Sequence, residues 1–182
     1  MIFNMDFYTI PKYSIINLFK DYPKDSFEYN YIFNDCIPYF DTHNYWSKNL
    51  PIGVYEDVED TNDMEIVGVC FFILDDYKGL KYLDIKRIMT CTKFRGEGYG
   101  SKLYQAICNH ALYSDVKYIR MFCAPEAKDF YKYMGCKFHG ECENGYSFVF
   151  QPIREFTRNA DTLILEKEFI DSQIKKYNGK KY

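Results

Sequence analysis

The sequence has few of the features that mark nucleic-acid-binding or membrane-spanning proteins. Its 182 residues carry 23 Lys and Arg against 26 Asp and Glu, a formal net charge of -3. No basic cluster is long enough to form a nucleic-acid footprint. The longest apolar run, Ile66 to Leu74, falls far short of the ~20 residues that a spanning helix needs. We therefore expect neither nucleic acid nor a membrane as a partner.

Signals for secretion and for a metal site are also weak. There is no N-x-S/T sequon, residues 1–6 lack a basic and apolar leader, and the seven cysteines are an odd number scattered through predicted strands and helices. This pattern favours a soluble protein in a reducing, cytoplasmic location. Cys136, His139 and Cys142 have a C-x-x-H-x-x-C spacing, but no fourth ligand is evident nearby and no metal is expected.

Aromatic residues are abundant, with 19 Tyr and 16 Phe, and hydrophobic residues make up 47% of the chain. The length and this composition predict one domain with a substantial aromatic core. Acidic residues gather at Asp57, Glu59, Asp60, Asp63 and Glu65. They are either a solvated loop or a feature that attracts a cationic amine.

Residues 81–103 indicate a strand, a glycine-rich loop and the start of a helix. The apolar alternation of the strand slips by one residue near Lys86 to Ile88, which predicts a β-bulge there. Gly96, Gly98 and Gly100 then alternate with larger residues before a helical pattern. The uncovered N–H groups of such a loop, together with the positive end of the helix dipole, favour binding of a phosphate.

Two common phosphate-binding loops do not fit. A Walker A loop ends in Gly-Lys-Ser/Thr, and a dinucleotide-binding turn has the pattern G-x-G-x-x-G. Here position 101 is Ser and position 103 is Leu.

The pattern that fits is R/Q-x-x-G-x-G/A, formed by Arg95, Gly98 and Gly100. With it, the chain resembles the GCN5-related N-acetyltransferase (GNAT) family over roughly residues 5–152. The resemblance implies an α/β (α+β) fold with a central, mixed, mostly antiparallel twisted sheet of about six to seven strands flanked by helices. We expect an acetyltransferase domain in residues 1–152 and a C-terminal helical extension in residues 153–182.

A second segment strengthens the resemblance. Ala127, Phe130, Tyr131, Gly135 and Phe138 match the family pattern N-x-x-A-x-x-L/F-Y-x-x-x-G-F. The Asn of that pattern is replaced by Ala124, so a side-chain amide that often contacts the pantetheine arm of the cofactor is missing.

The resemblance implies that acetyl-CoA (coenzyme A) is the cofactor, bound by the strand end and the loop. The cofactor-binding residues that it assigns are Ile88, Met89, Thr90, Arg95, Gly96, Glu97, Gly98, Tyr99, Gly100 and Ser101. Within this set, the N–H of Ile88 would polarise the thioester and the amide groups of Thr90 would pair with pantetheine. A bulge beside Ile88 would leave its N–H available.

Two side chains are candidates for proton transfer. Tyr131, as a phenol, is the candidate general acid for the departing thiolate, or else a buried aromatic at helical spacing. Asp84 lies four residues before Ile88, where some family members carry a glutamate base, or else it is a solvated strand residue. His110 and His139 are more consistent with structural positions.

The sequence thus predicts an acetyl-CoA-dependent N-acetyltransferase that acts on a primary amine by direct attack in a ternary complex. The acceptor would be a small cationic amine such as a polyamine, or a peptide or protein amine. The alternative is a non-catalytic acyl-CoA-binding domain. A homodimer is possible, because the C-terminal helix could pack on its own subunit or on a partner.

Overall fold

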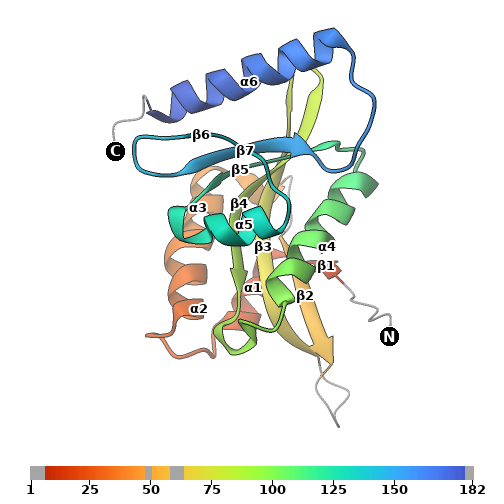
Figure 1. Cartoon of the computed structure of the whole chain (residues 1–182). Helices are drawn as coiled ribbons and strands as arrows, with labels where there is room; N and C mark the ends of the chain where they lie inside the picture. The colour runs from red at the N-terminus through yellow and green to blue at the C-terminus, as the bar shows by residue number, and fades with distance from the viewer. Residues whose placement is uncertain (1–6, 48–50, 58–63, 179–182) are drawn as a thin grey trace. The chain divides into compact units, whose positions relative to one another are not determined.

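The computed structural model describes residues 7–47, 51–57 and 64–178, and the predicted acidic residues Glu59, Asp60 and Asp63 lie outside these ranges (Figure 1). The chain forms two compact units. The first comprises residues 1–73 and 86–109, and the second comprises residues 74–85 and 110–182. The predicted boundary after residue 152 remains a prediction.

The first unit contains most of the N-terminal elements. They are β1 (Phe7–Thr9), α1 (Lys12–Phe19), α2 (Phe27–Asn30), the π-helical turn η1 (Tyr31–Cys36), α3 (Ile37–Thr42), the 3₁₀ turn η2 (Tyr45–Ser47), β2 (Ile52–Asp57) and the 3₁₀ turn η3 (Thr92–Phe94). Three further elements, β3 (Met64–Tyr77), β4 (Leu80–Thr90) and α4 (Tyr99–Tyr113), are shared with the second unit. The strand order here is β1-β2-β3-β4, and β2 pairs antiparallel with both β1 and β3.

The helical segment from Phe27 to Thr42 corrects one expectation. The sequence predicts that Pro38 interrupts this helix, yet the chain stays helical through it, with Pro38 in the first turn of α3. A proline normally clashes with the carbonyl four residues before it. The preceding turn is π-helical, with the N–H of Ile37 bonded to the carbonyl of Ile32. This wider turn accommodates the ring.

The second unit contains the remaining elements. They are β5 (Tyr118–Cys123), the 3₁₀ turn η4 (Pro125–Ala127), α5 (Lys128–Tyr133), β6 (Phe138–Glu141), β7 (Ser147–Pro152) and α6 (Ala160–Asn178). The strand order is β4-β5-β7-β6. The β4–β5 pair is parallel, as the helical connection predicts, whereas β7 pairs antiparallel with β5 and β6. This mixed, mostly antiparallel sheet with flanking helices is the predicted fold class.

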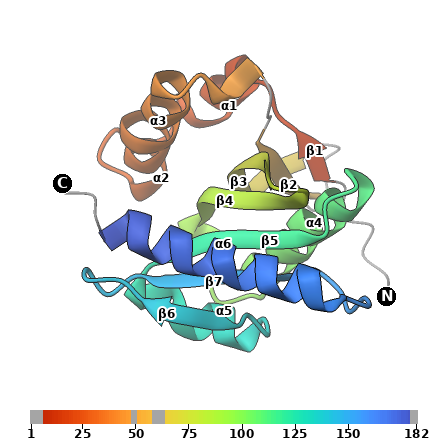
Figure 2. The same cartoon turned by 90° about the horizontal axis from the view of Figure 1, so that it is seen from above.

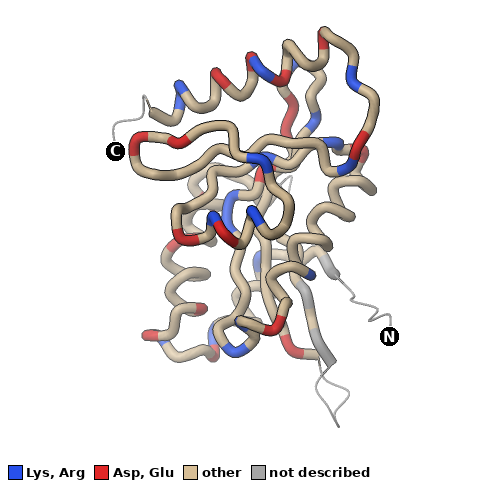
Figure 3. Tube along the Cα trace, in the orientation of Figure 1, with Lys and Arg blue, Asp and Glu red and all other residues tan. Residues whose placement is uncertain are grey.

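Helix α6 packs on its own chain. It is capped by Asn159, whose side-chain oxygen accepts from the N–H of Thr162 at 2.8 Å. It lies along β5 and β7 (Figure 2), and Phe169 packs into a buried cluster with Leu80, Tyr82, Tyr118, Phe148 and Phe150. Acidic residues predominate in the first part of this helix, and Lys175 and Lys176 lie in its last turn (Figure 3). Through Phe169, α6 therefore packs onto the sheet of the second unit.

Across the described ranges, no helix has the length and apolar character needed to cross a membrane.

Candidate functional site

The glycine-rich loop of the first unit lies between the end of β4 and the start of α4. Gly96 and Gly98 have φ angles of +86° and +83°, in the left-handed region that glycine adopts without strain. A Cβ built on either glycine would meet no atom within 4 Å. The loop is therefore open at both positions, and a side chain there would occupy space that a ligand can use.

Helix α4 begins directly behind this loop. Its first turn is closed by the N–H of Lys102, which donates to the carbonyl of Gly98 at 3.2 Å. The N–H groups of the first turn of a helix have no acceptor within the helix, and the helix dipole makes this end positive. Tyr99, Gly100 and Ser101 form that turn. The open loop and this helix end together fit the pyrophosphate group of coenzyme A.

Two side chains of α2, Phe27 and Glu28, contact residues that precede the glycines of the loop. The carboxylate of Glu28 accepts from the N–H of Thr92 at 2.5 Å. Burial raises the pKa of Glu28, but the hydrogen bonds from Thr92, a backbone hydrogen bond of Glu28 itself and the charge of Arg95 together outweigh burial, and the pKa lies below its ordinary value. Arg95 folds back so that its Nε donates to the carbonyl of Thr90 at 3.2 Å and its guanidinium lies 4.5 Å from the ring centre of Phe27.

The odd-numbered residues along β4 form backbone hydrogen bonds on one edge at the start of the strand and on the other edge at its end. The carbonyl of Lys81 accepts from the N–H of Lys117, at the entry to β5 (3.4 Å), whereas the N–H of Cys91 donates to Val67 on β3 (2.8 Å). In a regular strand, residues an even number apart direct their N–H and C=O groups to the same edge. One change of edge between Lys81 and Cys91 agrees with the predicted β-bulge.

Ile88 then lies on the edge of β4 that faces away from β3. The carbonyl oxygen of Met89 is so close to β3 that a Cβ on Gly68 would lie 2.7 Å from it, and Cys91 faces the same way. Ile88, one residue out of phase, directs its N–H and C=O to the opposite edge, where its carbonyl accepts from the hydroxyl of Tyr31 at 3.3 Å. Its N–H is thus outside the β3–β4 ladder, as an oxyanion donor requires.

Tyr131 belongs to the second unit. It lies on α5 with only 4% of its surface exposed, and its carbonyl accepts from the N–H of Cys136 at 2.9 Å. The ring of Phe130 packs edge-on at 5.0 Å between centroids. The short helix and the turn after it therefore hold this tyrosine in place. Ala124, which replaces the family Asn, directly precedes η4.

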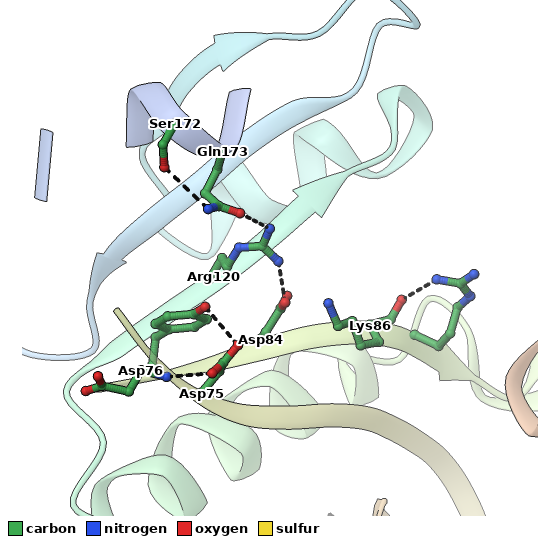
Figure 4. Close-up of polar contacts among 9 residues, drawn as sticks. Asp75, Asp76, Asp84, Lys86, Arg120, Ser172 and Gln173 are labelled. Atoms are coloured by element: carbon green, nitrogen blue, oxygen red, sulfur yellow. Dashed lines mark hydrogen bonds and ion pairs between the residues drawn. The ribbon is translucent and has the colours of Figure 1, made fainter. Parts of the chain in front are cut away.

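Asp84 is buried, with 3% of its surface exposed, so it is not a solvated strand residue. Its carboxylate forms an ion pair with Arg120, its partner in the parallel register of β4 and β5. Arg120 also donates to the side-chain oxygen of Gln173 on α6 at 2.8 Å, and Gln173 contacts Ser172 (Figure 4). The guanidinium opposes the approach of a cationic amine to this carboxylate.

Sequence reasoning missed Arg120. The available signal was a single cation in the otherwise apolar strand Tyr-Ile-Arg-Met-Phe-Cys, since buried charges are normally paired.

The two candidate histidines differ in environment. A ring nitrogen of His139 bonds to the carbonyl of Phe150 at 2.7 Å, which supports a structural position. Burial lowers the pKa of His110. Among the residues with described placement, no three His, Cys, Asp or Glu side chains lie close enough to hold a metal ion.

Solved structures share this fold. One, described as AtaTR bound with AcCoA, has a TM-score of 0.57 and 12% identity, covering 91% of this chain and 98% of the other. An aminoglycoside 6'-N-acetyltransferase complexed with coenzyme A has a TM-score of 0.57 and 13% identity, covering 85% and 100%. The GNAT family N-acetyltransferase YhbS from Escherichia coli, in complex with CoA, has a TM-score of 0.58 and 12% identity, covering 82% of each chain.

At these identities the likeness shows the fold. No curated protein matches the chain in sequence. A family model described as Acetyltransferase (GNAT) domain matches residues 53–136, a segment that includes the glycine-rich loop and the second motif as far as Gly135. The predicted enzyme class, an acetyl-CoA-dependent N-acetyltransferase, agrees with this match. Residues 53–136 therefore match the GNAT acetyltransferase domain, and the family resemblance found in the sequence is confirmed over this segment.

Proposed function

We propose that the protein transfers an acetyl group from acetyl-CoA to a primary amine by direct attack in a ternary complex. The observation that carries this proposal is the open glycine loop at the N-terminus of α4, with Gly96 and Gly98 in left-handed conformations. Bound acetyl-CoA supplies an activated thioester. The backbone from Arg95 to Ser101 would hold its pyrophosphate, and the edge of β4 away from β3, from Ile88 to Thr90, would contact its pantetheine arm.

Each catalytic role has a proposed group. The N–H of Ile88 faces the edge away from β3 and would donate to the thioester oxygen as negative charge develops there. Tyr131 would donate a proton to the departing thiolate. Asp84 remains the proposed base for the amine. Because its carboxylate is paired with Arg120, a small shift of either side chain must expose the carboxylate to the acceptor.

The same ion pair favours a second candidate function. If Asp84 serves only to satisfy Arg120, the chain keeps its phosphate-binding loop without a base. The protein would then be a non-catalytic acyl-CoA-binding domain that acts as a sensor or interaction module.

We propose a small cationic amine, such as a polyamine, as the acceptor, with a peptide or protein amine as the alternative. The net charge of -3 and the acidic residues 57–65 support the cationic choice. Glu65 is partly neutralised, since its carboxylate pairs with Lys93 at 2.7 Å. Among structures of the same fold, one is the NatC complex bound to Gag peptide and another is an AtaT mutant bound to the C-terminus of an antitoxin. These support the peptide alternative.

The acceptor is tested by the salt dependence of kcat/KM. Electrostatic steering acts on the association rate and is screened over about 8 Å at physiological ionic strength. For a polyamine, kcat/KM should fall as salt rises, and should fall again in Asp60→Asn/Asp63→Asn with kcat unchanged. A salt-independent kcat/KM for cationic amines, or a phosphorylated amino sugar as the best acceptor, would contradict a cationic acceptor.

A further inference from the structure

The π-helical turn η1 presents two polar side chains to β4. The hydroxyl of Tyr31 donates to the carbonyl of Ile88 at 3.3 Å, and the carboxylate of Asp35 accepts from Nε of Arg87 at 2.9 Å. Tyr31 and Asp35 are four residues apart and therefore share one face of the helical segment. Turns of this kind are rare and occur frequently at functional sites.

These contacts hold the carbonyls that precede and follow the peptide group between Arg87 and Ile88. Nη1 of Arg87 donates to the carbonyl of Lys86 at 2.8 Å, and Tyr31 donates to the carbonyl of Ile88. Ile88 directs its carbonyl, and with it the N–H proposed to contact the thioester oxygen, to the edge of β4 away from β3. The carbonyl held by Arg87 belongs to Lys86, two residues earlier in the same segment.

Neighbouring carbonyl oxygens are unfavourable for an oxyanion. The carbonyl of Ile88 carries partial negative charge, and an oxyanion bound at the N–H of the same residue would lie on the same edge. The hydroxyl of Tyr31 offsets that charge and holds the carbonyl of Ile88 in place, and Arg87 holds the carbonyl of Lys86, so the donor is preorganised. Burial raises the pKa of Tyr31, so its hydroxyl remains a donor throughout the neutral pH range. Arg87 is held further by the ring of Tyr39, 4.5 Å from its guanidinium carbon.

We propose that Tyr31 is a positioning residue for acetyl transfer, which with Arg87 fixes the edge of β4 so that the N–H of Ile88 points at the thioester oxygen. This inference rests on the proposed function. It predicts an effect on the chemical step and little effect on cofactor binding, because neither side chain is needed to hold the pyrophosphate.

The test is Tyr31→Phe, which removes only the hydroxyl. One hydrogen bond of this kind corresponds to a loss of about 10-fold in kcat. The Kd for acetyl-CoA should stay within about 2-fold, within the scatter expected for a contact that does not touch the ligand. The infrared carbonyl stretch of bound acetyl-CoA, labelled with ¹³C at the acetyl carbonyl, should move back toward its frequency in free acetyl-CoA, because the thioester is less polarised. Tyr29→Phe is the matched control, since Tyr29 lies in the same segment and packs against Phe33 at 4.5 Å. It should match wild type in all three readouts.

The outcomes separate the inference from the proposed function. If wild type neither turns over nor shifts the carbonyl stretch, the proposed function fails and the inference falls with it. If wild type does both and Tyr31→Phe matches it in kcat and stretch, the inference alone is wrong. A loss of kcat accompanied by an equal loss of acetyl-CoA affinity, with the stretch unchanged, would also overturn it.

A second variant applies if Tyr31→Phe does not fold. Asp35 is half-exposed, so Asp35→Asn should fold while loosening Arg87. We expect kcat to fall less than in Tyr31→Phe. The carbonyl stretch of bound acetyl-CoA should shift in the same direction as in Tyr31→Phe. Wild-type values for both in Asp35→Asn would overturn the proposal.

Discussion

Replacement of Gly98 by valine should reduce the affinity for coenzyme A by about 10²- to 10⁴-fold, which corresponds to the loss of two charge-assisted hydrogen bonds. Gly98 has a φ of +83°, which a β-branched residue adopts only with strain. The valine would therefore turn the backbone N–H groups away and place its methyl groups in the open space of the loop. Isothermal titration with coenzyme A measures the change.

The chain offers a matched control for this variant. Gly79 has a φ of +91°, and a Cβ there also meets no atom within 4 Å, but it lies in the β3–β4 turn, outside the predicted cofactor-binding segment. Gly79→Val and Gly98→Val should each lower the free energy of unfolding by about 1–2 kcal/mol. Only Gly98→Val should lose coenzyme A binding. Unchanged affinity in a folded Gly98→Val variant would show that this loop does not bind the cofactor.

Tyr131→Phe should lower kcat by about 10²- to 10⁴-fold, the usual effect of removing a general acid, with little change in the Kd for acetyl-CoA. The ring is kept, so the packing of this buried residue against Phe130 is preserved. Single-turnover kinetics, which isolate the chemical step, provide the measurement.

Tyr133→Phe is the control for this variant. Tyr133 lies on the same helix and is 82% exposed, so its hydroxyl should not affect turnover. If Tyr131→Phe retained the wild-type rate while chemistry is rate-limiting, the buried tyrosine would be only a packing residue.

The loop and the fold could be predicted because their signals are local. Gly96 and Gly98 take left-handed conformations that favour glycine, and their spacing before an amphipathic helix identifies the strand–loop–helix unit. The slipped alternation near Lys86 to Ile88 likewise indicated a bulge.

The remaining features depend on tertiary contacts that leave little trace in the sequence. Asp84 gives no sign of being buried, because its partner Arg120 lies 36 residues further along the chain. The π-helical turn has no side-chain pattern that marks it in a sequence. Pro38 instead predicts the end of a helix, because proline normally interrupts one. In the sequence, Tyr31 is therefore one aromatic residue among many, and only the hydrogen bond from its hydroxyl to the carbonyl of Ile88 distinguishes it.

The most direct test of acetyl transfer is the release of free coenzyme A thiol from acetyl-CoA, measured with each amine of a panel and without any amine. Wild type should release thiol continuously with at least one cationic amine and show no burst without an amine, because the amine attacks the thioester directly. Tyr131→Phe should release thiol at least about 100-fold more slowly with the same amine. Tight binding of acetyl-CoA with no thiol release for any amine would contradict the enzyme and support the acyl-CoA-binding module, and a burst without acceptor would contradict direct transfer.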